Sequence, residues 1–123
     1  MVECVSEWDT KNVISFLNLF KKDATFNGTL NDWDTSSATG MSSMFYQAST
    51  FNGNLNGWDT SKVTVMRSML NMYKSPTKFN GNLAAWDVSA VESFYNAFNL
   101  ASAFTGKETL CGLASEEWDI GCN

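Results

Sequence analysis

Every tryptophan in this sequence is followed by an aspartate, and the pairs recur at nearly regular intervals. Successive tryptophans are 25, 25, 28 and 32 residues apart. A second marker, Phe-Asn-Gly, begins at Phe26, Phe51 and Phe79, and Phe104-Thr105-Gly106 is a degenerate copy. A repeat of this period predicts units that stack and bury a continuous core. The pairs are Trp8-Asp9, Trp33-Asp34, Trp58-Asp59, Trp86-Asp87 and Trp118-Asp119.

Apolar residues recur five, eight and twelve positions after each tryptophan, as at Ala38, Met41 and Phe45. Spacings of three and four are typical of one face of an α-helix, which predicts a helix in each unit. A serine stands just before each expected helix, where its side chain could cap the first turn. These helix caps are Ser36, Ser61 and Ser89, whereas the first unit carries Lys11 at that position.

Phe-Asn-Gly follows each expected helix, and its glycine is expected to supply a positive φ for a sharp turn. A short extended piece then carries Leu30, Leu55 or Leu83. Strands joined by helices run parallel. We therefore expect an α/β solenoid of about four strand–turn–helix repeats, with short parallel strands on one face and helices on the other. The 123 residues suffice for one domain, with units at 8–32, 33–57, 58–85 and 86–106 and a C-terminal cap at 107–123.

Two segments, 33–53 and 58–69, carry the motif Trp-Asp-Thr-Ser followed by Met and Ser at fixed places. They resemble the tandem repeat of BspA-like surface proteins, and the resemblance covers roughly residues 7–106. It departs at an insertion over 73–78 and in the tail after Gly106. The resemblance implies a leucine-rich-repeat-like fold and a non-catalytic binding or adhesion role at the cell surface or outside the cell. It supplies no catalytic motif and names no cofactor.

Composition excludes several kinds of chemistry. The chain has no histidine, so a Ser-His-Asp site and imidazole-ligated zinc or haem are excluded. Its net charge is −5, which argues against a nucleic-acid partner. No apolar run reaches the roughly 20 residues that span a bilayer, and the first residues do not look like a signal peptide. We expect a non-enzyme that uses no cofactor.

Equal positions of a stacked repeat form columns, and one column is a row of carboxylates. Neighbouring carboxylates in such a row repel each other, so a favourable interaction must offset this repulsion. Either each aspartate accepts backbone N–H groups in its turn, or the row binds Ca²⁺. The column contains Asp9, Asp34, Asp59 and Asp87.

The tryptophan column also allows two interpretations. The rings either point inward, where burial stabilises the fold by a few kcal/mol each, or form an exposed row that stacks on sugars or a partner protein. A neighbouring column of threonines resembles that of ice-binding solenoids but breaks at Val88, which argues against that function.

Inward-pointing tryptophan and leucine would leave a small, polar, uncharged strand face. Leucine-rich-repeat-like proteins usually bind there, so by analogy this face is the candidate binding surface. The alternative is that its residues are simply hydrated. The candidate residues are Thr29, Asn31, Asn54, Asn56 and Asn82.

The three cysteines lie near the ends of the chain. A disulfide between Cys111 and Cys122 would close the divergent tail and indicate an oxidising compartment. Cys4 is then a free thiol or forms an intermolecular bond. Asn27-Gly28-Thr29 also matches a glycosylation sequon.

These features together predict a non-catalytic module that contacts protein or glycan, extracellularly or at the cell surface. The alternative is a structural subunit of an intracellular or organellar complex, which docks through the short edges at the ends of the stack.

Overall fold

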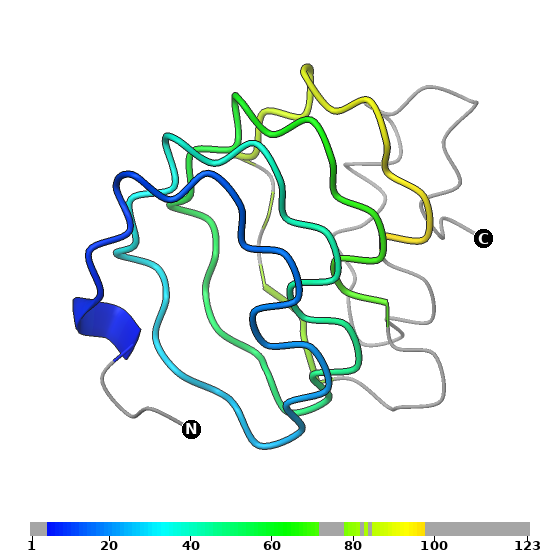
Figure 1. Cartoon of the computed structure of the whole chain (residues 1–123). Coiled ribbons are helices and arrows are strands. Elements are labelled where there is room, and N and C mark those ends of the chain that lie inside the picture. Colours follow the sequence, from blue (N-terminus) through cyan, green and yellow to red (C-terminus); the bar gives the residue numbers. More distant parts are fainter. Residues whose placement is uncertain (1–4, 72–77, 82, 84, 98–123) are drawn as a thin grey trace.

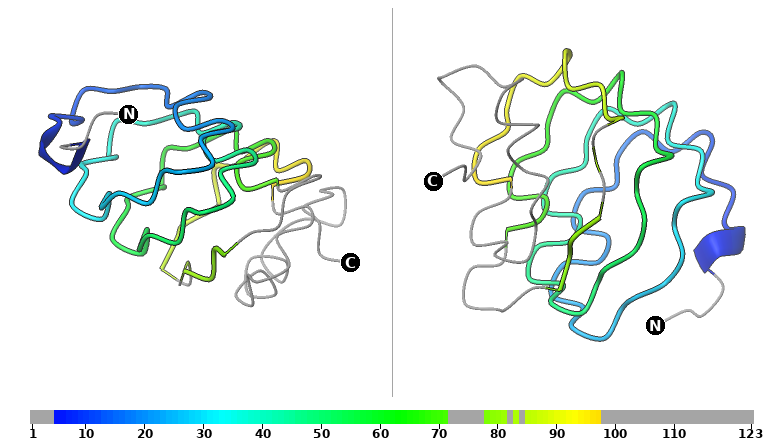
Figure 2. Two further views of the ribbon diagram at one scale, coloured as in Figure 1. Left: turned by 90° about the horizontal axis from the view of Figure 1, so that it is seen from below. Right: turned by 180° about the vertical axis from the view of Figure 1, so that it is seen from behind.

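The computed structural model describes residues 5–71, 78–81, 83 and 85–97. The chain winds into a stack of coils, and each coil begins at a Trp-Asp pair and lies against the next along the chain (Figure 1 and Figure 2). We call these coil 1 (8–32), coil 2 (33–57), coil 3 (58–85) and coil 4 (86–97), within the described ranges. Hydrogen bonds between the coils join residues 24 to 31 apart in the sequence.

Among the described residues, the α-helices expected after the Trp-Asp pairs of coils 1 to 4 do not form. The helix that the described residues contain is η1 (Val5–Glu7), a single 3-10 turn. In coil 1 the N–H groups of Leu19, Lys21 and Asp23 donate to carbonyls three residues earlier, which makes successive turns. Alternate N–H groups of the same segment donate instead to backbone carbonyls of coil 2. The donor–acceptor pairs are Phe16–Gly40, Asn18–Ser42, Phe20–Met44 and Lys22–Tyr46. The prediction of an α/β solenoid with a helical face was therefore wrong.

The backbone conformation that replaces the helix recurs at fixed places. A residue with positive φ stands ten positions after each tryptophan from Trp8 to Trp86: Asn18, Ser43, Ser68 and Asn96, with φ from 55° to 61°. Lys22 and Gln47, which stand fourteen positions after Trp8 and Trp33, also have a positive φ. A left-handed residue interrupts the hydrogen bonds between residues four apart that define an α-helix. Successive turns can also bring residues three and four apart to one side, so the apolar spacing alone does not distinguish the two conformations.

The expected strands are also absent from the described residues. Isolated parallel bridges join Ser15 to Gly40, Gly40 to Val65, and Val65 to Ser93. These residues lie seven positions after each tryptophan, inside the segments expected to be helical. The pieces around Leu30 and Leu55, expected to be strands, contain no β-bridge. The prediction of a strand face was therefore wrong too.

Stacked aromatic rings form the core. The rings of Trp33 and Trp58 lie 6.2 Å apart and nearly parallel, and those of Trp58 and Trp86 lie 6.4 Å apart. A second column joins Phe26 to Phe51 and Phe51 to Phe79 at 5.8 and 5.9 Å. Offset stacking at such distances is favourable beyond burial alone. The remaining core includes Leu30, Leu55, Met41, Met44, Met66 and Met69, all buried.

Buried polar side chains hold neighbouring coils in register. The Thr10, Thr35 and Thr60 hydroxyls are buried and donate to the carbonyls of Asp34, Asp59 and Asp87 in the next coil, at 3.0, 3.1 and 3.0 Å. The threonine column is thus internal, and each hydroxyl has an acceptor, as buried polar groups require.

Several predicted features lie outside the described residues. These are the Cys111–Cys122 bridge, Cys4, Trp118, Asn82, the end of the fourth unit and the cap at 107–123. No helix among the described residues has the length and apolar character needed to cross a membrane.

Candidate functional site

A groove of about 370 Å³ lies where the Phe-Asn-Gly segments of coils 2 and 3 meet. Among the described residues, asparagine and glycine line it, and none of these side chains is charged. The lining residues are Asn52, Gly53, Asn54, Asn56, Asn80 and Gly81. We call this the asparagine groove.

Side-chain oxygens within the groove are already used to hold the backbone. The Oδ1 atom of Asn52 accepts the N–H of Asn80 at 2.9 Å, and Oδ1 of Asn54 accepts the N–H of Asn56 at 2.9 Å. Coil 1 repeats the first pattern, since Oδ1 of Asn27 accepts the N–H of Asn52 at 2.9 Å. Because Oδ1 is engaged, the Nδ2 group with its two N–H donors is the part of each amide that can face a ligand.

The glycines of the Phe-Asn-Gly segments are required by close packing and not by a positive φ. The φ of Gly28, Gly53 and Gly81 lies outside the positive range, so the expectation of a left-handed turn at these glycines was wrong. A Cβ at Gly53 would lie 2.7 Å from Cε1 of Phe51 and 3.3 Å from the Gly28 carbonyl oxygen. Glycine is thus required by the close approach of the buried phenylalanine ring and the preceding coil.

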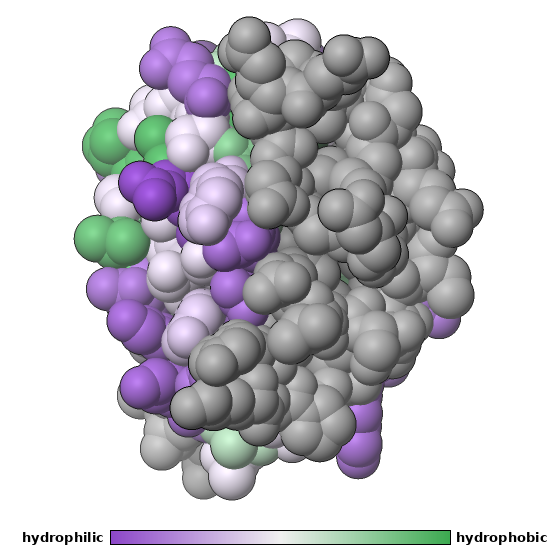
Figure 3. Space-filling view, turned by 90° about the vertical axis from the view of Figure 1, so that its right-hand side faces the viewer, coloured by the Kyte–Doolittle hydropathy of each residue, from purple (hydrophilic) through white to green (hydrophobic). Residues whose placement is uncertain are grey.

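The structure brings together part of the predicted binding face. Asn54 and Asn56 line the groove, whereas Thr29 is exposed outside its lining and Asn31 is half-buried, with Oδ1 accepting the Gly57 N–H at 3.1 Å. Asn52 and Asn80 were missed because Phe-Asn-Gly was interpreted only as a turn. The exact recurrence of its asparagine could have indicated a shared surface. The described part of the face in Figure 3 shows mainly hydrophilic residues with separate hydrophobic ones among them.

The aspartate column is a row of hydrogen-bonded turns. Oδ1 of Asp59 accepts both the N–H of Ser61 at 3.0 Å and its hydroxyl at 2.6 Å. Asp34 with Ser36 and Asp87 with Ser89 repeat this pattern. With no helix to cap, the predicted helix-cap role of Ser36, Ser61 and Ser89 was wrong: the serines donate to the preceding aspartate.

These bonds favour the ionised carboxylates. The serine hydroxyl, and then the serine N–H, lower the pKa of Asp34, Asp59 and Asp87 below the ordinary value of 3.8. At the equivalent place beside Asp9, Lys11 stands instead of a serine, and its Nζ lies 3.7 Å from Oδ2 of Asp9. Among the described residues no group of three or more acidic or cysteine side chains is gathered as a metal site would need.

The tryptophans of coils 2, 3 and 4 are not available as a binding platform. Trp33, Trp58 and Trp86 are buried, and each Nε1–H donates to a carbonyl of the preceding coil or of η1. Trp8 differs: it is 41% exposed, and among the described aromatic rings it stacks on that of Trp33 alone.

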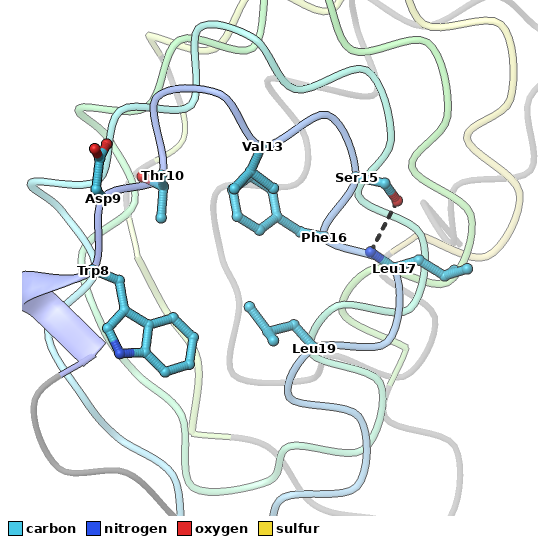
Figure 4. A pocket seen from close by; sticks show the side chains of 8 residues that line it. All are labelled: Trp8, Asp9, Thr10, Val13, Ser15, Phe16, Leu17 and Leu19. Carbon is cyan, nitrogen blue, oxygen red and sulfur yellow. Dashed lines mark hydrogen bonds between the residues drawn. The ribbon is translucent and has the colours of Figure 1, made fainter.

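A second cavity, of about 390 Å³, lies beside Trp8 at the coil 1 end of the stack. Figure 4 shows Trp8, Leu19 and Phe16 around this space, with Asp9 pointing away from it. Unlike the asparagine groove, this cavity is largely apolar. It contains no residue of the predicted binding face.

Comparison with known proteins gives one family. No curated protein and no solved structure matches the chain. The sequence model of one family matches residues 1–110, which is most of the chain. The chain therefore belongs to the repeat family of surface proteins described as Mycoplasma protein of unknown function, DUF285.

Proposed function

We propose that this chain is a non-catalytic binding module of a surface repeat protein, and that the asparagine groove is its ligand face. The observation that carries the proposal is the lining of the groove, in which every described residue is asparagine or glycine. Uncharged amide donors suit the hydroxyl groups of a neutral glycan better than a phosphate or a carboxylate, which would need cationic partners.

The amides are held in place before a ligand arrives. Asn52 and Asn54 are exposed, yet the Oδ1 atom of each accepts a backbone N–H at 2.9 Å. Holding Oδ1 toward the backbone orients Nδ2 toward the groove. Such preorganisation reduces the entropy lost on binding, which supports a role in recognition.

Membership in a surface-protein repeat family supports a location at the cell surface. The resemblance of 33–53 and 58–69 to BspA-like repeats supports an adhesion role in particular. The ionisable groups of the described coils agree with a non-catalytic role, since Asp34, Asp59 and Asp87 each serve a turn.

Binding of neutral oligosaccharides by the full chain tests the proposal. Asn54→Asp keeps the Oδ1 acceptor for the Asn56 N–H but removes the two Nδ2 donors. Losing one or two hydrogen bonds of about 1 kcal/mol each should weaken binding about tenfold. Asn52→Asp should act in the same way.

Asn12→Asp is the matched control, because Asn12 is exposed and does not line the groove. It makes the same change in charge and should leave the affinity unchanged. Equal affinities of the groove variants and the control for a bound oligosaccharide would contradict the proposal. So would a chain that binds none of the neutral oligosaccharides.

A further inference from the structure

The asparagines on the groove side of the stack form two columns that cross from coil to coil. In the first column, Oδ1 of Asn27 and Oδ1 of Asn52 each accept the N–H of the next asparagine along the stack, at 2.9 Å, and the column ends at Asn80. In the second column, Oδ1 of Asn31 and Oδ1 of Asn56 accept backbone N–H groups of the next coil at 3.1 and 3.4 Å. The amide orientation therefore repeats from one coil to the next.

Both columns lie on the outer face of the Phe-Asn-Gly segments. Asn52 and Asn54 are exposed and Asn56 is half-buried, whereas Leu55 between them is buried. Such alternation places every second side chain on one face. The same order of buried, half-buried and exposed positions recurs over 26–31 in coil 1. The surface that forms the asparagine groove thus continues into coil 1.

The spacing and the straightness of the columns limit the shape of a ligand that could follow them. The ring of Phe51 lies 5.8 Å from that of Phe26 and 5.9 Å from that of Phe79, and each pair is within 8° of parallel. Adjacent hydrogen-bonded backbones lie about 4.8 Å apart, so the amides repeat every 5–6 Å or so. A ligand that bonds to every coil must therefore be straight and have this repeat.

A linear sugar chain meets both conditions. A hexopyranose ring spans about the same distance between its two linkage oxygens, and β-1,4 links, which are equatorial, keep the chain extended. Hydroxyl groups stand along both edges of each ring, so units turned over in alternation still present an oxygen to every coil. Axial α-1,4 links instead curve the chain. An extended peptide repeats its same-side groups about every 6.6 Å, which is longer than the spacing of the coils.

We infer, building on the neutral-glycan binding proposed above, that the ligand is a linear β-1,4-linked hexopyranose chain that lies along the stack with one sugar unit on each coil. The asparagine groove then holds the units on coils 2 and 3. Coil 1 holds a further unit through the Nδ2 groups of Asn27 and Asn31, whose Oδ1 atoms are already bonded to coil 2.

Calorimetric titration of the full chain with β-1,4-linked oligomers of glucose and of N-acetylglucosamine tests this arrangement. In at least one series, affinity should rise about fivefold from the disaccharide to the trisaccharide, as one more unit gains a hydrogen-bonding partner. The α-1,4-linked trisaccharide of glucose should bind at least about fivefold more weakly than the β-linked one.

The outcomes separate this inference from the function on which it rests. Equal affinities for one, two and three units would overturn the alignment along the stack, yet leave neutral-glycan binding in place. An α-linked trisaccharide that binds as tightly as the β-linked ones would overturn the extended chain. Failure of every neutral oligosaccharide to bind would overturn both the function and the alignment.

Asn27→Asp tests the part of the site that lies on coil 1. It keeps the Oδ1 acceptor for the Asn52 N–H and removes the two Nδ2 donors. The variant should weaken trisaccharide binding about fivefold, but disaccharide binding less than about twofold, because coils 2 and 3 still hold two units. Asn12→Asp makes the same change in charge at an exposed position outside the groove and should alter neither affinity. Unchanged trisaccharide affinity in Asn27→Asp would overturn the extension onto coil 1.

Discussion

The indole Nε1–H of Trp58 donates a hydrogen bond to the Leu30 carbonyl oxygen, 2.8 Å away in the preceding coil. Both residues are buried, and the same bond joins Trp86 to Leu55 at 2.9 Å. Trp58 and Trp86 thus stack on neighbouring rings and also supply the donor that a buried carbonyl needs.

Trp58→Phe should destabilise the protein strongly, because it removes this donor and leaves space beside two stacked rings. We expect a loss of about 2–4 kcal/mol in the free energy of unfolding, measured in urea. Trp8→Phe is the control: Trp8 is 41% exposed, and its Nε1–H has no acceptor among the described residues. A loss of less than about 1 kcal/mol is expected there. Equal losses for the two variants would contradict the proposed difference.

Thr35→Val tests the threonine column, because it changes the hydroxyl with little change in shape. The Thr35 hydroxyl is buried and donates to the Asp59 carbonyl at 3.1 Å. Losing that donor should cost about 1–2 kcal/mol of unfolding free energy in chemical denaturation. Val88 occupies the same column in coil 4, so valine fits sterically. Thr29→Val, at an exposed position, should change stability by less than about 0.5 kcal/mol.

Stability should fall in acid because of the aspartate–serine turns. Folding lowers the pKa of Asp34, Asp59 and Asp87, so it favours their ionised form. Their contribution is complete above the ordinary pKa of 3.8 and is lost as the pH falls through the lower folded-state pKa. Urea unfolding between pH 6 and pH 2, roughly the range where aspartates titrate, measures this loss.

A variant with alanine at Ser36, Ser61 and Ser89 should lose less stability across the same pH range, because the hydroxyl is the largest cause of each pKa shift. An unchanged slope of stability against pH in that variant would contradict the assignment. Asp59→Asn should also flatten the slope, since an amide oxygen can still accept the Ser61 N–H without titrating.

The alignment of columns could be predicted from the sequence, because the Trp-Asp and Phe-Asn-Gly spacings fix which residues lie side by side. The conformation between these markers could not. Residues three and four apart fall on one side of both a helix and a series of turns. Two of the six residues that adopt positive φ are asparagine, which favours that region, but the other four are serine, lysine and glutamine, whose identity does not indicate it.

The candidate site was predictable in part for a similar reason. Asn54 and Asn56 follow Phe-Asn-Gly in an expected surface strand, so they could be placed on an exposed face. Asn52 and Asn80 join them because asparagine side chains bond along the stack: Oδ1 of Asn27 accepts the Asn52 N–H, and Oδ1 of Asn52 accepts the Asn80 N–H. That contact depends on the close approach of neighbouring coils, which the spacing of one unit does not reveal.

Gly53→Ala tests the packing of the Phe-Asn-Gly segment. Its new Cβ would lie 2.7 Å from the ring of buried Phe51 and 3.3 Å from the Gly28 carbonyl oxygen. Relieving this overlap should cost about 1–3 kcal/mol of unfolding free energy. At Gly40 the nearest atom to a new Cβ, Oγ of Ser15, is 3.5 Å away. Gly40→Ala should therefore cost much less, and similar thermal shifts for the two variants would contradict the packing account.

Substitutions at Ser43 test whether this residue adopts the left-handed conformation that is incompatible with an α-helix. Its φ is 55°, a region where a side chain costs about 1 kcal/mol and a β-branched one costs more. Ser43→Gly should leave the free energy of unfolding unchanged or raise it, because glycine adopts this φ without strain.

Ser43→Val should lower the free energy of unfolding by more than about 1 kcal/mol, since its branched Cβ meets the backbone at that φ. In a helical conformation the order would reverse, because valine is a better helix former than glycine. The ranking of these two variants in urea unfolding therefore discriminates the turns from a helix at this position.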